Sequence, residues 1–188
     1  MDTLVSTTSV APAPVALRKL YFLRFAFAAV WAALLFAAGG TLGPAAVTLL
    51  LVYPLFDVAA AIVDIRSARA DGGGAPALQV NIAISSLAVV GLAVAATSGV
   101  PAVLRVWGVW AITSGIVQLV AGATRRKLGG QWAMIISGGI STLAGASFFA
   151  QAGGDDASLT SLAGYAFLGG VFFLVSALRL NHRARNGV

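Results

Sequence analysis

The chain has 188 residues, of which 59% are apolar and 10% are charged, and its mean hydropathy is +0.93. A soluble protein normally has about 25% charged residues, so this composition excludes an ordinary soluble domain and makes the lipid bilayer the expected partner. The net charge of +6 does not indicate nucleic acid, because nearly all Lys and Arg residues lie at the edges of apolar runs. Without cysteine, the chain has no disulfide, thiol nucleophile or thiolate metal ligand.

Six segments are apolar enough to be membrane-spanning helices, each of which needs about 20 such residues. In chain order they are 20–39, 44–65, 78–98, 101–123, 132–151 and 159–180. Glycine and proline separate them, as in Gly39-Gly40 before the second segment and Gly99-Val100-Pro101 before the fourth. We therefore predict a disordered cytoplasmic tail at 1–17, a transmembrane domain at 18–181 and a basic cytoplasmic tail at 182–188.

The basic residues fall on one side of this predicted topology. Arg18 and Lys19 precede the first span, and the groups that follow the second, fourth and sixth spans include Arg66, Arg69, Arg125, Arg126, Lys127 and Arg179. The other three loops carry no Lys or Arg. Because basic loops stay in the cytoplasm, we expect a multi-pass protein of the inner (cell) membrane with both termini cytoplasmic.

The even-numbered spans align without gaps. Residues 53–64 read YPLFDVAAAIVD, residues 107–118 read WGVWAITSGIVQ, and residues 165–176 read YAFLGGVFFLVS. A repeat of this length indicates repeated supersecondary units, here hairpins at about 20–69, 78–127 and 132–181. The predicted fold is an all-α integral membrane protein of six transmembrane helices, formed by three parallel-repeated αα-hairpins with pseudo-threefold symmetry.

These repeated hairpins, with the unit WAMIISGGISTLAGASFF followed by GYAFLGGVFFLVSALRL, resemble the short-repeat membrane family that includes the HdeD acid-resistance protein. The resemblance covers roughly residues 20–180. It implies a six-span inner-membrane protein linked to acid or envelope stress, without established catalytic residues to carry over.

Two charged residues lie at matching depth in the first hairpin. Asp57 is about 10 Å from the cytoplasmic edge of its span, and Arg24 is about 6–9 Å inside the adjacent antiparallel span. A structural interpretation is an ion pair that locks the hairpin. In the functional interpretation, Asp57 takes up a proton or contacts a polar solute. Asp64, by contrast, is expected to be a solvated helix-end residue paired with Arg66 and Arg69, too far from Asp57 for a shared site.

One face of each even span carries aromatic and polar residues. The aromatic positions are Tyr53, Trp107 and Tyr165, and the polar positions nearer the cytoplasm are Ser114, Gln118 and Ser176. If these faces meet on one axis, they form a polar vestibule closed by aromatic rings. The alternative is that they hydrogen-bond across helices within a filled bundle core. Small residues at Ser137, Ser141 and Gly145 predict a close approach of another helix.

Catalysis has little support in the sequence. The chain has no Glu, its single histidine is His182 in the basic tail, and it lacks hydrolase and metalloprotease motifs. We therefore expect no enzyme, cofactor or metal site. The expected function is that of a non-enzymatic HdeD-like membrane protein; the alternative is a small transporter or a proton or solute pathway that uses Asp57 paired with Arg24. Small-residue faces also allow a homo-oligomer, and the ligand is unknown.

Overall fold

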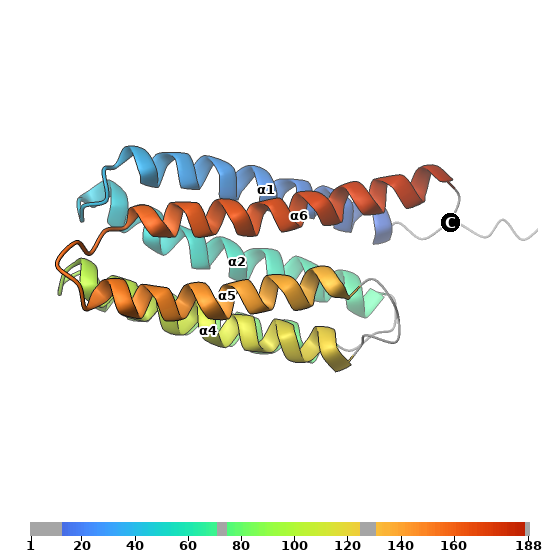
Figure 1. Cartoon of the computed structure of the whole chain (residues 1–188). Helices are drawn as coiled ribbons and strands as arrows, with labels where there is room; N and C mark the ends of the chain where they lie inside the picture. The colour runs from blue at the N-terminus through green and yellow to red at the C-terminus, as the bar shows by residue number, and fades with distance from the viewer. Residues whose placement is uncertain (1–12, 71–74, 125–130, 187–188) are drawn as a thin grey trace, which may run out of the picture.

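The computed structural model describes residues 13–70, 75–124 and 131–186, which form six helices. Their bounds are α1 (Ala13–Ala37), α2 (Pro44–Ala70), α3 (Pro76–Ala95), α4 (Val100–Thr124), α5 (Trp132–Ala152) and α6 (Thr160–Asn186). The helices run alternately up and down one bundle, and α1 begins at the same end at which α6 finishes (Figure 1). We call this the basic end, because Arg18, Lys19, Arg66, Arg69 and Arg179 lie near it; the opposite end is the packed end.

All six helices are long and apolar enough to cross a membrane. Large apolar side chains also cover the outside of the bundle, where Leu87, Leu143 and Phe36 are each more than 60% exposed. Such a surface is suited to lipid rather than water, because soluble proteins rarely expose large contiguous apolar areas. The fold is therefore compatible with a multi-pass membrane protein.

The helices extend beyond the predicted spans mainly at the basic end. The first helix begins at Ala13, inside the segment predicted to be a disordered tail, and the last one continues to Asn186. Pro14 is compatible with this start because the first turn of a helix needs no backbone N–H donors. The predicted anchors Arg125, Arg126 and Lys127 lie outside the described residues.

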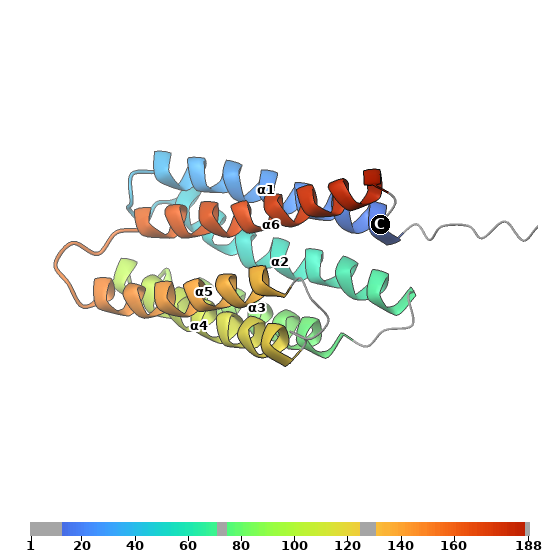
Figure 2. The same cartoon turned by 45° about the vertical axis from the view of Figure 1, so that its right-hand side comes forward.

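Helix packing follows a regular order around the bundle. The closest pairs are α4 with α5, α1 with α6 and α2 with α3, whereas α5 and α6 touch much less. Both views show α1 beside α6 and α4 beside α5, and α3 is visible near α4 in the turned view (Figures 1 and 2). Each close pair thus joins two different predicted hairpins.

A glycine seam brings α4 and α5 into backbone contact. Gly108 faces Gly145, and Gly115 faces Gly138; a Cβ atom added at Gly115 would lie 2.7 Å from the Gly138 carbonyl oxygen. Only glycine permits such an approach. We predicted that the small residues Ser137, Ser141 and Gly145 allow the close approach of another helix. Gly145 does contact α4, but the second contact with α4 is made by Gly138 and not by Ser137.

The buried apolar core occupies the packed end. Trp31, Leu35, Leu50, Leu104 and Phe148 are almost completely buried there. The link between α1 and α2 closes over this core at Gly40, whose carbonyl accepts a 3.2 Å hydrogen bond from the Leu159 N–H. Gly40 has φ +75°, and a Cβ atom there would collide with Ser158, so this link depends on glycine.

Candidate functional site

The half of the bundle nearest the basic end contains a partly open cavity of about 730 Å³. Residues of all six helices line it, and it reaches Ala77 and Ala133 at the starts of α3 and α5 and Ala121 near the end of α4. Most of its wall is apolar. The polar and charged lining residues are Arg24, Tyr53, Asp57, Asp64, Asn81, Ser114, Gln118, Ser137, Ser141, Tyr165 and Ser176, together with Tyr21 and Trp110.

An aromatic cluster separates this cavity from the packed core. Tyr53 lies 5.7 Å from Trp107 and 6.0 Å from Trp110, measured between ring centroids. Trp31 stacks on Trp107 at 5.5 Å and meets the edge of Tyr53 at 4.6 Å. Such offset and edge-to-face contacts are the favoured aromatic geometries. Tyr53 and Trp110 line the cavity, and Trp31 and Trp107 are buried in the core behind them; we call these four rings the floor of the cavity.

Arg24 lies at the centre of a charged cluster in the cavity wall. Its Nη1 donates to Asp57 Oδ1 at 3.1 Å, and its Nη2 donates to Asp64 Oδ2 at 3.3 Å. The guanidinium also lies over the Phe173 ring of α6, 4.8 Å from the ring centroid. The Arg24 side chain is only 8% exposed, so its charge depends on these partners.

Asp57 is held from three sides. In addition to Arg24, the Asn81 amide donates to Asp57 Oδ2 at 2.7 Å, and the Ser85 hydroxyl donates to the same oxygen at 2.8 Å. Trp110 in turn donates its indole N–H to Ser85 Oγ at 3.1 Å. Helices α1, α2 and α3 therefore meet at one carboxylate, and α4 joins them through Ser85, which is the kind of polar network that fixes helix positions.

The structure corrects the expectation for Asp64. Its side chain is 11% exposed and faces Arg24, not a solvated helix end, and it shares this arginine with Asp57. The two carboxylates are two helical turns apart along α2, but the two-armed guanidinium bridges them. The prediction that Asp57 and Asp64 cannot share a site is therefore wrong.

With both carboxyls ionised, the cluster has an excess of one negative charge, because Arg24 is the single basic residue and Asp57 and Asp64 are the two acidic residues among the described lining residues. Several buried polar atoms also have no hydrogen-bond partner among the residues that the structure describes: Arg24 Nε, Asp64 Oδ1, Ser114 Oγ and Trp107 Nε1. Unpaired buried polar atoms are rare in folded proteins and call for an explanation. Within the described residues, no group of three or more His, Cys, Asp or Glu comes together.

The predicted axis residues occupy two environments. Tyr53 and Tyr165 line the cavity together with Ser114, Gln118 and Ser176, whereas Trp107 is fully buried in the floor. Ser176 Oγ donates to the Phe172 carbonyl of its own helix at 2.9 Å. The polar positions therefore border a shared hollow on α4 and α6.

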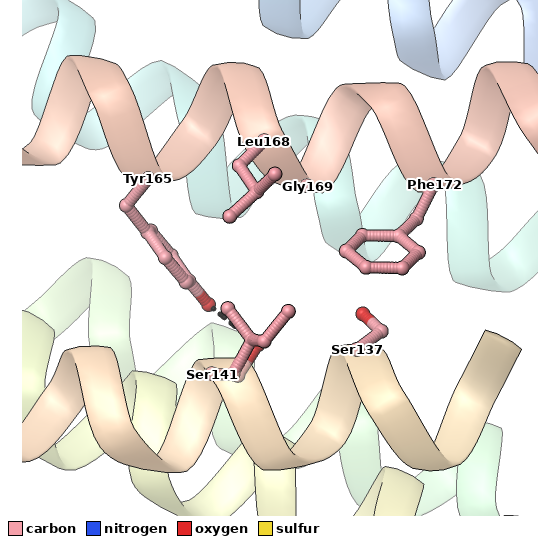
Figure 3. A pocket seen from close by; sticks show the side chains of 7 residues that line it. Ser137, Ser141, Tyr165, Leu168, Gly169 and Phe172 are labelled. Atoms are coloured by element: carbon pink, nitrogen blue, oxygen red, sulfur yellow. Dashed lines mark hydrogen bonds between the residues drawn. The ribbon is translucent and has the colours of Figure 1, made fainter.

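Tyr165 bridges the loosely packed pair α5 and α6. Its hydroxyl donates to Ser141 Oγ at 3.1 Å, across a small crevice that Ser137, Gly169 and Phe172 also line (Figure 3). All five residues border the large cavity as well. A Cβ atom added at Gly169 would meet nothing within 4 Å, which shows how open this seam is compared with the glycine seam.

Sequence reasoning missed Asn81, Ser85 and Trp110 as members of the charged cluster. Asn81 carried a usable signal, because it is an amide one to two turns inside the third span, as Arg24 is in the first. Trp110 carried none beyond its position one turn after Trp107. The anchors Arg66, Arg69 and Arg179 are exposed at the basic end.

Fold and site together define a six-helix, membrane-compatible bundle with a cavity at one end, whose mainly apolar wall contains a cluster of charged and polar residues. The chain matches no protein-family model, no curated protein and no solved structure.

Proposed function

We propose that the chain is a non-enzymatic, multi-pass protein of the inner membrane that binds a small solute in its cavity and provides part of the path by which that solute crosses the bilayer. The observation that carries this proposal is the cavity of about 730 Å³, which all six helices line and whose wall contains the Arg24 cluster. Ionisable residues inside membrane spans are costly and commonly mark substrate or ion pathways.

The asymmetry of the interior supports a path with one closed end. At the basic end the helices are held apart around the cavity, and at the other end Trp31, Trp107 and the residues behind them fill the bundle. A solute would therefore enter from the basic end and stop at the aromatic floor. Alternating access in transporters needs such a site with one side closed.

Several polar groups converge on the cavity, which distinguishes this proposal from a bundle held together by one ion pair. Asn81, Ser114, Gln118 and Ser176 accompany the charged residues and belong to three different helices. Binding sites typically have a mainly apolar wall with a few placed polar groups. We propose that these groups orient the solute while the Arg24 cluster sets the charge of the site.

The orientation that we propose places the basic end in the cytoplasm, so that both termini are cytoplasmic. The exposed Arg66, Arg69 and Arg179 at that end support it.

We also propose the threefold repeat of hairpins. Its support is that the close pairs α2–α3, α4–α5 and α6–α1 follow one rule, an even helix packing on the next odd one.

Cysteine accessibility tests whether the cavity is open to water. The chain has no native cysteine, so Gln118→Cys introduces one thiol at the cavity wall, and Val109→Cys places a matched thiol on the half-exposed outer face of the same helix. A charged, membrane-impermeant thiosulfonate should label Gln118→Cys in inside-out vesicles and should leave Val109→Cys unlabelled.

Asp156→Cys, in the exposed link between α5 and α6, is the control for orientation and should label only in right-side-out vesicles. If Gln118→Cys stays unlabelled in both orientations while Asp156→Cys reacts, the cavity is not open to water and the proposed pathway is wrong. Conduction itself is tested by proton flux in proteoliposomes, where wild type should exceed both empty vesicles and the Asp57→Asn variant.

The second candidate is the stress-linked role implied by the resemblance to HdeD-type proteins. The regular order of the close helix pairs favours it, because that order fits the repeated hairpins on which the resemblance rests. Acid survival of expressing cells separates the two candidates. A pathway through the cavity predicts that Asp57→Asn abolishes any protection, whereas a role through membrane presence predicts that protection persists at equal protein level.

A further inference from the structure

We infer that the solute of this cavity is a monovalent organic cation with an apolar body. The inference rests on the proposed function and adds to it the chemical class of the ligand. It follows from three independent properties of the cavity: the sign of its charge, its aromatic surface and its size.

The charge of the cavity favours a cation. Its described lining has one guanidinium and two carboxyl groups, which leaves one negative charge uncompensated when both carboxyls are ionised. Each terminal nitrogen of Arg24 already donates to a carboxylate, Asp57 or Asp64, so the arginine is matched by more negative charge than it carries. Asp57 remains 20% exposed, and Asp64 Oδ1 has no partner among the described residues. A bound monocation would neutralise the site, and inside a membrane neutral sites are strongly favoured.

The aromatic surface favours an organic cation over an inorganic one. The rings of Tyr21, Tyr53, Trp110, Phe172 and Phe173 belong to the lining. The Phe173 ring already holds the Arg24 guanidinium at 4.8 Å, which shows that this wall can present an aromatic face to a positive charge. Aromatic faces together with carboxylates are the usual recognition chemistry for quaternary ammonium and related cations. A calcium ion would instead need about 6–8 oxygen ligands.

The size of the cavity favours a ligand with a substantial apolar body. A volume of about 730 Å³ lies within the range of roughly 300–1,000 Å³ that is common for sites of drug-sized molecules. Because most of the wall is apolar, a compact hydrated ion would leave that wall without a partner. A cation with attached rings or alkyl groups would cover it and place the charge beside the carboxylates.

Two probe ions of equal shape and opposite charge test the inference: tetraphenylphosphonium and tetraphenylborate. The full chain is reconstituted in nanodiscs of zwitterionic lipid, and binding is measured by titration calorimetry after subtraction of empty nanodiscs. We expect saturable binding of the phosphonium, and binding of the borate at least about tenfold weaker, because the excess carboxylate charge attracts one ion and repels the other.

Three variants locate the binding charge. Asp64→Asn removes the excess charge and should weaken phosphonium binding about tenfold or more, whereas Asp64→Glu keeps the charge and should retain binding. Asp156→Asn removes an equal charge from the exposed link outside the cavity and should bind like wild type. Elution as a single species shows that each variant is folded. If Asp64→Asn does not fold, the comparison of phosphonium and borate binding to wild type and Asp64→Glu still tests the inference.

Equal or tighter binding of the borate, or unchanged phosphonium binding in folded Asp64→Asn, would overturn the inference. So would absence of saturable phosphonium binding to a protein whose Gln118→Cys variant is labelled by the thiosulfonate. In that last case the cavity and the proposed pathway stand, and only the class of ligand is wrong. If Gln118→Cys is not labelled either, the proposed pathway and the inference both fail.

Discussion

The charged cluster predicts unequal contributions of its two aspartates to stability. Asp57→Asn and Asp64→Asn each remove one negative charge and leave one carboxylate for Arg24. The effect of removing that charge on the free energy of unfolding is therefore common to both variants and cancels when the two are compared. What remains is the hydrogen bonding. Asp57 accepts from Arg24, Asn81 and Ser85, whereas Asp64 accepts, among the described side chains, only from Arg24.

The magnitude follows from this inventory. In Asp57→Asn the amide oxygen can keep the bonds from Asn81 and Ser85, but they fall from about 1.5–3 kcal/mol to about 0.5–1.5 kcal/mol each. The new NH₂ group then faces the Arg24 Nη1 donor, and that bond is lost. In Asp64→Asn the oxygen can still accept from Arg24, and the NH₂ replaces the unpartnered Oδ1. The difference is about 3 kcal/mol, which corresponds to about 6–12 °C in apparent Tm for a chain of this size.

The assay is the fraction of protein that still elutes as one species after heating in detergent. Asp57→Asn should melt about 6–12 °C below Asp64→Asn, and Asp64→Asn and the control Asp156→Asn should lie close to wild type. If Asp64→Asn melts as low as Asp57→Asn, the free oxygen of Asp64 has a stabilising partner and the reasoning from the hydrogen-bond inventory is wrong.

Two further predictions concern packing around the cavity. Gly115→Ala places a methyl group against the Gly138 carbonyl and should lower the free energy of unfolding by about 1–3 kcal/mol. At Gly169 an added methyl group meets no other atom, so Gly169→Ala should be neutral or slightly stabilising because alanine favours helix. Equal melting of the two variants would contradict the glycine seam. Trp110→Phe removes the indole N–H that donates to Ser85 and should lower the free energy of unfolding by about 1 kcal/mol. The measurement is the melting temperature of the variant in the detergent assay described above, compared with wild type. An unchanged or higher melting temperature would show that this bond does not stabilise the cluster.

The six helices were predictable because hydropathy dominates a chain whose surroundings are apolar. The second helix begins at Pro44, as predicted; the fourth is one residue longer than predicted at each end, and the fifth only at its C-terminal end. The start of the first helix at Ala13 was missed, because a polar, Pro-containing segment carries no hydropathy signal. Helices can extend past the apolar span, where charged and polar residues are solvated.

Contacts between helices were only partly accessible from the sequence. Matching depths along the helix axis brought Arg24 and Asp57 together, since rise per residue fixes that coordinate. The rise per residue also led us to predict that Asp57 and Asp64 are too far apart to share a site. That estimate describes backbone positions only, whereas both side chains extend toward the Arg24 guanidinium. The sequence also does not indicate which helices pack against each other. That Gly138 of α5 contacts α4 is known only from the structure.

The aromatic floor gives the chain an optical reporter at the site itself. Three of its four tryptophans, Trp31, Trp107 and Trp110, lie in that floor, with centroids of successive rings 5.5 and 5.1 Å apart. The fourth, Trp132, is 70% exposed at the start of α5. Indoles this close couple in the ultraviolet, so near-ultraviolet circular dichroism and emission of a Trp132→Phe protein would follow the cavity floor directly, without an attached dye, whenever a molecule enters above it.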